Sequence, residues 1–353
     1  MKHVIDLDDF SLQQLQYIID LSAQIMQNSA EFAQSCKGKI MATLFYEPST
    51  RTQMSFQAAM KRLGGDTIGF DNPMNSSVAK GESLKDTIKI IAGYVDIIAM
   101  RHPMAGSAKA ATFYSDAPVI NGGDGSHLHP TQTLTDVITL CREKGTLNNH
   151  VIGLCGDLKN GRTVHSLAKT MSKFEGNSFV LISTPQLALP DYIKNLLDMR
   201  GCKYTEVNSL KEAIGTLDVL YMTRIQGERF DSPEEYEKQK GVFVLDRPKM
   251  ELAKNDLIVL HPLPRVDEIA LEVDDDPRAL YFKQAVYGMY GRMALIHTLL
   301  NNPEFEITPA HKGKKSSNPC CNAKCITQQE KYLYPGVYDM GGEAVCEFCE
   351  EEV

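Results

Sequence analysis

Apolar and polar stretches alternate regularly between residues 39 and 265. Short apolar runs such as Ile40–Phe45 and Val151–Cys155 predict buried strands. Further strands are expected at Asp66–Phe70, Ile97–Met100, Val119–Asn121, Ser178–Ile182, Val219–Thr223, Phe243–Val244 and Ile258–His261. Helical spacing of apolar residues predicts helices at Ser11–Asn28, Thr50–Leu63, Glu82–Tyr94, Pro130–Lys144, Arg162–Lys173, Pro190–Arg200 and Ala285–Leu300. This alternation is typical of parallel sheets built from βαβ units.

Polar or Gly-rich residues follow six of these strands, in two sets. Ligands of such folds bind beyond the carboxyl ends of the strands. The pattern therefore predicts the α/β class, with two domains that each hold a mainly parallel sheet flanked by helices and that face one cleft. We expect the first domain at 1–134 and the second at 135–284, with the last long helix, 285–303, returning to the first.

The pattern changes after Pro303. The segment 304–318 is short and basic, which predicts a linker. Residues 319–353 form a small unit with five of the nine cysteines. Four residues separate Cys320 from Cys325, and two separate Cys346 from Cys349. Paired cysteines at such spacing predict a zinc domain with four cysteines in a tetrahedral site, with Cys321 as an alternative to Cys320. A chance cluster is the simpler alternative.

Composition limits the classes of function. The 353 residues carry a net charge of −8, which argues against nucleic acid as the main partner. No apolar run approaches the roughly 20 residues that span a bilayer, and the start lacks the apolar stretch of a signal peptide. We therefore expect a cytoplasmic protein without a membrane partner. The scattered cysteines are expected to be buried free thiols: Cys36, Cys141, Cys155 and Cys202.

The run Ser49–Thr52 is the most informative candidate site. Three hydroxyls and a guanidinium follow a predicted strand and begin a predicted helix. Free N–H groups at a helix N-terminus bind anions, so this turn predicts a phosphate site. The simpler alternative is a helix cap beside a surface arginine.

Other strand ends add to this set and predict a strongly anionic ligand or ligand pair, since Arg matches carboxylate and phosphate. For any single arginine an ordinary salt bridge is an equal alternative. The whole set comprises Arg51, Arg101, His129, Gln132, Arg162, Arg224, Gln226 and Arg265.

Several stretches together resemble the aspartate carbamoyltransferase family, specifically its catalytic chain, over about residues 1–303. They are Ser49–Thr52, Ser77–Glu82, Met100–Pro103, Gly123–Ser126 with His129–Thr133, Gly156–Leu158 with Gly161–Ser166, Tyr221–Gln226 and His261–Arg265. The resemblance implies transfer of the carbamoyl group of carbamoyl phosphate to L-aspartate, giving N-carbamoyl-L-aspartate and phosphate, in pyrimidine biosynthesis. It implies no cofactor for this chemistry.

The resemblance also implies roles for individual residues. The implied catalytic residues are Arg51, Thr52, Arg101 and His129. The implied carbamoyl phosphate site holds Ser49, Thr50, Arg51, Thr52, Ser77, Lys80, Arg101, His129 and Gln132. The implied aspartate site holds Lys80, Arg162, Arg224, Gln226, Leu263 and Pro264. Glu47 and Arg229 match residues that join the two domains on closure.

Ser77 and Lys80 match residues that enter the active site of an adjacent subunit. The resemblance thus implies a homotrimer with shared active sites, although the loop alone would predict only a solvated segment. The resemblance also implies that trimers associate into a larger assembly through the zinc domain.

The acceptor needs its own argument, because ornithine carbamoyltransferases share the Ser-Thr-Arg-Thr signature. Arg224 suits the β-carboxylate of aspartate and would repel the ammonium of ornithine. The sequence Thr223–Gln226 therefore favours aspartate.

The C-terminal unit at 319–353, called the tail below, is similar to the zinc domain of the aspartate carbamoyltransferase regulatory chain. The first cysteine pair of that domain also encloses four residues. This similarity selects Cys320, with Cys325, Cys346 and Cys349, as ligands of one structural zinc per chain. The nucleotide-binding domain of that regulatory chain has no counterpart here.

A function of another class also fits the fold. An inactive assembly or binding protein could keep both domains and use the zinc unit for a partner. Such a protein would be expected to lose the arginine and histidine set, which this sequence retains.

Overall fold

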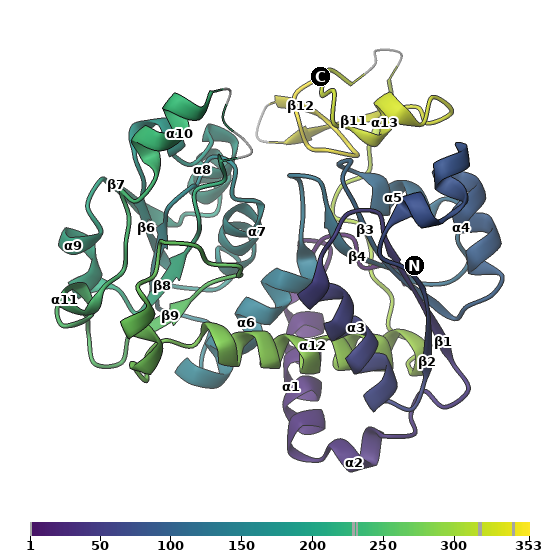
Figure 1. The fold of residues 1–353 in the computed structure, drawn as a ribbon, viewed down its shortest axis with the longest axis horizontal. Helices are drawn as coiled ribbons and strands as arrows, with labels where there is room; N and C mark the ends of the chain where they lie inside the picture. Colours follow the sequence, from purple (N-terminus) through teal and green to yellow (C-terminus); the bar gives the residue numbers. More distant parts are fainter. Residues whose placement is uncertain (1, 228–229, 231, 317–319, 341–342) are drawn as a thin grey trace. The chain divides into compact units, whose positions relative to one another are not determined.

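The computed structural model describes residues 2–227, 230, 232–316, 320–340 and 343–353. The chain divides into two compact units (Figure 1). Unit 1 comprises Met1–Ile138 and Tyr287–Val353, and unit 2 comprises Thr139–Val286. Two helices, α6 (Pro130–Lys144) and α12 (Tyr281–Asn301), belong partly to each unit.

Unit 1 is built on a four-stranded parallel sheet of order β2-β1-β3-β4. Its strands are β1 (Ile40–Phe45), β2 (Asp66–Phe70), β3 (Ile97–His102) and β4 (Val119–Asp124). Phe45 pairs with Arg101, so the carboxyl ends of the two central strands lie side by side.

The other helices of unit 1 are mostly short. They are α1 (Leu12–Gln27), α2 (Ser29–Phe32), α3 (Thr50–Arg62), α4 (Leu84–Ala92), α5 (Ser107–Thr112), α13 (Ile326–Gln329) and the 3-10 helices η1 (Pro73–Asn75) and η2 (Ser77–Lys80). Ser11 begins α1 with a capping box to Gln14.

Alternate residues of the sheet face opposite layers. Ala42, Leu44, Ile98 and Met100 pack in one buried cluster with residues of α4 and α5. On the other face, Thr43 accepts a hydrogen bond of 3.3 Å from Gln57 of α3.

Arg292 explains why α12 returns to unit 1. Its buried guanidinium lies 5.1 Å from the centre of the Phe56 ring, and Nη1 donates to Ser55 Oγ at 3.2 Å. Burial lowers the pKa of Arg292 to about 10. The contacts join α12 to α3.

Unit 2 holds a five-stranded parallel sheet of order β7-β6-β5-β8-β9. The strands are β5 (Val151–Cys155), β6 (Ser178–Ile182), β7 (Lys203–Val207), β8 (Val219–Met222) and β9 (Ile258–Leu260). Its helices are α7 (Arg162–Met171), α8 (Asp191–Met199), α9 (Leu210–Ala213), α10 (Pro233–Gln239) and α11 (Arg247–Met250), with the 3-10 helices η3 (Pro185–Leu187), η4 (Ile214–Thr216) and η6 (Leu271–Asp275).

The tail adds a small antiparallel sheet of β10 (Lys314–Lys315), β11 (Gly336–Met340) and β12 (Glu343–Cys346). Its buried residues, among them Ile326, Leu333 and Phe348, belong to the same cluster as α4, α5 and the four-stranded sheet. The tail therefore shares the core of unit 1.

The sequence predicted the α/β class and most strands correctly, and the structure corrects several elements. Phe243–Val244 is not a strand; the adjacent Leu245 forms only an isolated bridge with Ile269. Strand β7 was missed, because as an exposed edge strand it carries charged residues. Among the described residues, no helix has the length and apolar character needed to cross a bilayer.

Gly106 provides a test of how the tail packs. Its φ is +80°, and a Cβ there would lie 2.5 Å from both the Cβ and the carbonyl oxygen of Phe348. Gly106→Ala should loosen the tail by about 1–3 kcal/mol, since backbone must move. Hydrogen exchange of tail amides measures this opening.

Gly38→Ala is the matched control, because Gly38 has a φ of +78° and a Cβ added there would meet nothing within 4 Å. Both variants share the cost of a left-handed alanine. Equal tail exchange in the two variants would contradict the close packing of Phe348 on Gly106.

Candidate active site and metal centre

The turn between β1 and α3 carries the predicted phosphate-binding hydroxyls. Ser49 occupies the N-cap position of α3, but its side chain makes no capping hydrogen bond. A capping serine accepts from an N–H of the first turn. The Ser49 hydroxyl therefore accepts no hydrogen bond from the backbone N–H groups in the first turn of α3. These groups form the positive end of the helix dipole. The simple capping alternative fails at this residue.

Arg101 of β3 brings a second guanidinium to this edge of the sheet. Its Nη2 lies 2.6 Å from Glu47 Oε1, and the Arg101 side chain is 12% exposed. Its buried Nε has no hydrogen-bond partner among the described residues. Burial lowers the pKa of Arg101, and burial followed by the charge of Arg101 lowers the pKa of Arg51. The charge of Arg101 thus acts on Arg51, and a guanidinium offers donors that suit an anion.

Gly123 sets the spacing between Arg101 and His129. A Cβ on Gly123, whose φ is +121°, would lie 2.8 Å from Arg101 Nη1 and 3.6 Å from His129 Cδ2. Both side chains therefore lie against the α-carbon of Gly123. His129 is buried directly before α6. The structure thus brings together Arg101 and His129, and the charge of Arg101 acts on Arg51.

The remaining predicted residues of unit 1 differ in their surroundings. Thr50 and Thr52 lie in the first turn of α3, beside Arg51. Gln132 lies in the first turn of α6, and its Nε2 donates to Asp136 Oδ1 at 2.8 Å. Ser77 and Lys80 lie in η2 and are exposed, so they are not part of the buried group around Arg101.

The residues predicted to bind aspartate follow three neighbouring strands of unit 2. Strands β5, β8 and β9 are adjacent and parallel, so the residues after them lie at one edge of the sheet. Arg162 begins α7 after β5, Arg224 and Gln226 follow β8, and Leu263 and Pro264 follow β9.

Gln226 joins two of these loops. Its backbone N–H donates to Asp157 Oδ2 at 3.4 Å, and its Nε2 donates to the Asn160 carbonyl at 3.0 Å. Burial raises the pKa of Asp157, although hydrogen bonds from Asn160 act in the opposite direction. The loops after β5 and β8 are therefore held as one unit.

The loop after β9 has an unusual backbone. Leu263 has a φ of +54° and precedes a cis peptide bond to Pro264. Its N–H donates to His261 Nδ1 at 2.7 Å, and His261 Nε2 lies 2.7 Å from Glu268 Oε1. Left-handed residues other than glycine are uncommon and occur often at binding sites.

Arg265 has partners of its own within unit 2. It forms an ion pair with Asp274, and its Nη1 donates to Tyr281 Oη at 3.1 Å. For this residue the ordinary salt bridge is the correct alternative.

Sequence reasoning missed how Arg101 is held. Glu47, expected to join the two domains with Arg229, pairs with Arg101 in this structure, and Arg229 lies outside the described residues. Asp124 and His127 also organise the edge of the sheet. Both lie inside the Gly-rich motif, but only the folded loop reveals their partners.

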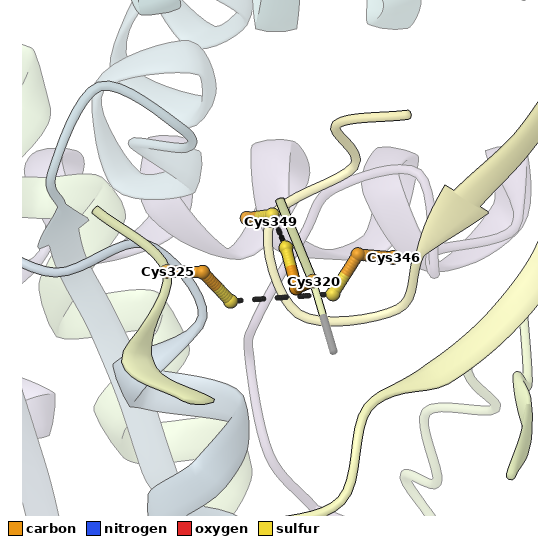
Figure 2. Close-up of side chains that lie close together, drawn as sticks. All are labelled: Cys320, Cys325, Cys346 and Cys349. Atoms are coloured by element: carbon orange, nitrogen blue, oxygen red, sulfur yellow. Dashed lines mark hydrogen bonds between the residues drawn. The ribbon is translucent and has the colours of Figure 1, made fainter. Parts of the chain in front are cut away.

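Four tail cysteines form a compact cluster (Figure 2). The Sγ atoms of Cys320, Cys325, Cys346 and Cys349 all lie within 4.8 Å of one another, and all four residues are buried. Cys320 and Cys349 are 3.5 Å apart at Sγ, and Cys325 and Cys346 are 4.0 Å apart. Tetrahedral zinc with Zn–S bonds of about 2.3 Å separates its sulfurs by about 3.8 Å, so the cluster fits this metal. Cys321 is exposed and lies outside it.

Cys325 has the environment of a thiolate ligand. Hydrogen bonds from Cys346 and Cys349 lower the pKa of the Cys325 thiol. Thr327 Oγ1 also donates to Cys325 Sγ at 3.2 Å. The thiolate is the form of cysteine that binds metal.

The fold agrees with the family to which the chain belongs. Residues 2–142 match the family described as aspartate/ornithine carbamoyltransferase, carbamoyl-P binding domain, and residues 148–299 match its Asp/Orn binding domain. The chain is thus a member of the aspartate/ornithine carbamoyltransferases. Within them it belongs to the aspartate carbamoyltransferase catalytic subunit family.

Two relatives show this more finely. The aspartate carbamoyltransferase catalytic subunit of Clostridium novyi (strain NT) is 56% identical over 299 residues, which cover 85% of this chain and 98% of the relative. That of Clostridium perfringens (strain SM101 / Type A) is 58% identical over 300 residues, with the same coverage of 85% and 98%.

Solved structures also match the fold, at lower sequence identity. The catalytic subunit of M. jannaschii aspartate transcarbamoylase has a TM-score of 0.80 and 48% identity, covering 87% of this chain and all of its own. Trypanosoma cruzi aspartate transcarbamoylase in complex with carbamoyl phosphate and aspartate has a TM-score of 0.76 and 36% identity, covering 85% and 96%. The family match ends at residue 299, so the cysteine tail lies beyond it.

The choice between two adjacent cysteines can be tested directly. Cys320→Ser should lower the bound metal well below one per chain, because a thiolate ligand is lost. Cys321→Ser, at an exposed position, should leave the metal content unchanged. Mass spectrometry of the native protein measures both. Full metal in the Cys320→Ser variant would contradict the cluster as a four-thiolate site.

Proposed function

We propose that this protein transfers the carbamoyl group of carbamoyl phosphate to the α-amino group of L-aspartate, giving N-carbamoyl-L-aspartate and phosphate. The observation that carries the proposal is that Arg101 and His129 lie together against Gly123, with Arg51 within reach of the charge of Arg101. The named activity of the relatives and the substrate complexes of the T. cruzi enzyme support it.

In this proposal residues 1–134, with helix 285–303, bind carbamoyl phosphate. The hydroxyls of Ser49, Thr50 and Thr52, the first N–H groups of α3 and the Arg51 guanidinium hold the phosphate. Arg101, His129 and Gln132 hold the carbamoyl group. The positive end of α3 and two guanidiniums favour a dianion at this position.

The reaction needs orientation and charge stabilisation. The neutral α-amino nitrogen of aspartate attacks the carbamoyl carbon, and the carbonyl oxygen gains negative charge as a tetrahedral intermediate forms. Thr52, Arg101 and His129 donate to that oxygen. The bond from carbon to the phosphate oxygen then breaks, and the departing phosphate accepts the proton from the amine. Orientation and fixed donors together supply on the order of 10 kcal/mol.

Residues 135–284 bind aspartate in this proposal. Arg162, Arg224 and Gln226 hold its carboxylates, and the backbone of Leu263 and Pro264 faces the carbamoyl nitrogen. The single edge that β5, β8 and β9 share supports the grouping. Positive charge at Arg224 favours a β-carboxylate over the ammonium of ornithine.

We also propose a homotrimer whose active sites are shared. Ser77 and Lys80 would enter the active site of a neighbouring subunit, where Lys80 contacts both substrates. Their exposure in η2 supports this role. The zinc unit could extend the assembly further.

The four-cysteine cluster is proposed to hold one structural zinc per chain. Four thiolates complete a tetrahedral site, so such a metal stabilises the tail and takes no part in the transfer. We place the protein in the cytoplasm, where thiols stay reduced and free to bind metal.

A colorimetric assay for carbamoyl-aspartate tests the function, with ornithine as the competing acceptor. Arg224→Ala should weaken aspartate binding by about 2–5 kcal/mol, because a charged contact is lost. Binding of carbamoyl phosphate should not change, because different arginines hold it. Lys211→Ala, at an exposed lysine of the same unit, is the control.

No carbamoyl-aspartate from the wild-type protein would refute the proposed function. Unchanged aspartate kinetics in Arg224→Ala would refute only the role of Arg224. Faster reaction with ornithine than with aspartate would reverse the choice of acceptor.

Mixed trimers test the shared site. Lys80→Ala and Arg51→Ala subunits should each be inactive alone, and their reassembled mixture should regain activity, since some sites then combine an intact Lys80 with an intact Arg51. Trimers reassembled from one variant alone serve as the control. Confirmed mixed trimers without activity would contradict sharing.

A further inference from the structure

Both halves of the cysteine cluster rest on the segment that follows β3, the strand that carries Arg101. Cys325 forms a parallel bridge with Ala105, which follows β3. Ala105 N–H donates to the Lys324 carbonyl at 2.9 Å, and Ile326 N–H donates to the Ala105 carbonyl at 2.9 Å. One cluster cysteine is thus joined by backbone hydrogen bonds to the loop after Arg101.

The second half of the cluster lies against the next residues of the same loop. Phe348, between Cys346 and Cys349, packs against the α-carbon of Gly106. Lys109 Nζ lies 3.5 Å from Glu347 Oε2. Both cysteine pairs therefore contact the segment after β3.

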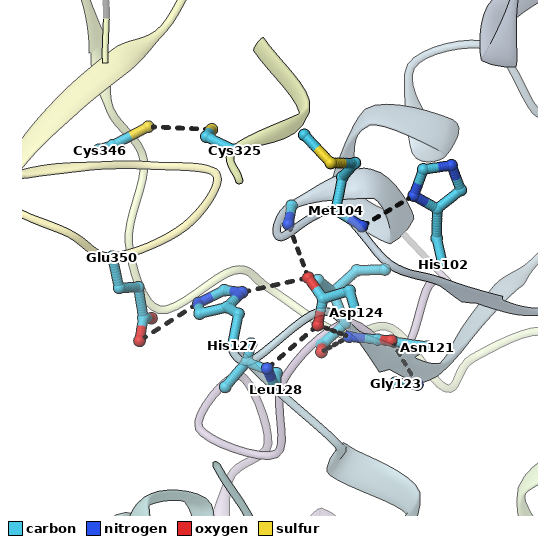
Figure 3. Close-up of polar contacts among 12 residues, drawn as sticks. His102, Met104, Asn121, Gly123, Asp124, His127, Leu128, Cys325, Cys346 and Glu350 are labelled. Atoms are coloured by element: carbon cyan, nitrogen blue, oxygen red, sulfur yellow. Dashed lines mark hydrogen bonds and ion pairs between the residues drawn. The ribbon is translucent and has the colours of Figure 1, made fainter. Parts of the chain in front are cut away.

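Asp124 at the end of β4 is the centre of a buried network (Figure 3). Its Oδ2 accepts from Gly106 N–H at 2.7 Å and lies 3.1 Å from His127 Nδ1. Its Oδ1 accepts from Asn121 Nδ2 at 2.9 Å and from Leu128 N–H at 3.1 Å. One carboxylate thus orders both loops.

His127 extends this network to the tail. Its Nε2 lies 3.5 Å from Glu350 Oε2, an ion-pair distance. Glu350 directly follows Cys349, and its own N–H donates to the Cys346 carbonyl at 2.8 Å. Tyr338 Oη donates to Glu350 Oε1 at 3.3 Å. The carboxylate is therefore oriented by the turn that bears two cluster cysteines.

At its other end the network reaches the anion site. Asn121 Oδ1, fixed by its bond to Asp124, accepts from Gly123 N–H at 2.8 Å. The α-carbon of Gly123 lies against both Arg101 and His129. A shift of Asp124 would therefore move Gly123 and change the positions of Arg101 and His129, the two side chains proposed to bind the carbamoyl group.

His127 is suited to transmit such a shift because its two ring nitrogens face the carboxylates of Asp124 and Glu350. Burial lowers its pKa, but Asp124 and Glu350 outweigh this effect and raise the pKa of His127 to about 10. A buried cation between two carboxylates holds both in place, and loss of one partner leaves an unbalanced charge.

We propose that His127 and Glu350 are positioning residues that couple the metal-bound tail to the carbamoyl phosphate site through Asp124. The proposal rests on the proposed function. A metal in the cysteine cluster fixes the turn that bears Glu350, and Glu350 fixes His127 and Asp124. Coupling between two sites is reciprocal, so a metal that favours the anion at Arg51 and Arg101 is itself favoured by that anion, by the same factor.

Zinc affinity tests this coupling without relying on catalysis. The wild-type protein competes with a chromogenic chelator for zinc at equilibrium, with and without saturating inorganic phosphate. We expect phosphate to raise the zinc affinity of the wild-type protein about 5-fold or more. His127→Gln and Glu350→Gln should remove this phosphate effect, because each neutralises one member of the pair.

Glu351→Gln is the matched control, since Glu351 is the exposed neighbour of Glu350, and it should keep the phosphate effect. A merely structural role would lower zinc affinity without removing its dependence on phosphate. If His127→Gln bound no metal at all, the Glu350→Gln variant would still test the proposal, because glutamine has nearly the same shape as glutamate.

An unchanged phosphate effect in both variants would overturn the proposal. A wild-type protein that forms carbamoyl-aspartate but whose zinc affinity does not depend on phosphate would also overturn the proposal. The proposed function would then stand. A wild-type protein that neither binds phosphate nor forms carbamoyl-aspartate would overturn both.

Discussion

The closeness of two arginines at one sheet edge is the constraint on which the rest of unit 1 depends. Arg51 lies in the first turn of α3 after β1, and Arg101 lies near the end of the neighbouring strand β3. Burial and then the charge of Arg101 lower the pKa of Arg51. Such an arrangement is unfavourable unless negative charge balances it. Glu47 offsets part of it at Arg101. The remaining positive charge, with the N-terminus of α3, is the reason we propose carbamoyl phosphate at this edge.

The tail differs from an independent accessory domain because its core is shared. Its cysteines and Phe348 belong to the same cluster as α4, α5 and the central strands. A segment this short buries too little apolar surface to fold alone, so it depends on metal and on the surface beneath it. That surface includes α4, α5 and the segments that follow β3 and β4; Arg101 lies near the end of β3, and His129 follows β4. Stability of the tail and geometry of the site are therefore linked by shared residues.

The sequence predicted what depends on local pattern. Apolar runs predicted β1, β5 and β6 with their observed bounds, and cysteine spacing predicted a cluster that the structure forms. It could not predict contacts made between distant segments. The ion pair of Arg265 with Asp274, the Glu47–Arg101 pair and the network around Asp124 depend on how loops fold back. The sequence predicted a linker at residues 304–318 and therefore a separate tail. It did not predict that the tail shares the core of unit 1, because that core joins distant segments.

Calorimetric titration with carbamoyl phosphate in the absence of aspartate tests the central claim most directly. The account predicts one site per chain in the wild-type protein. In Arg51→Gln that binding should be weaker by at least about tenfold, because hydrogen bonds to a charged group are lost. Wild-type protein that does not bind carbamoyl phosphate, or an Arg51→Gln variant that binds it equally tightly, would contradict the arginine pair as the anion site.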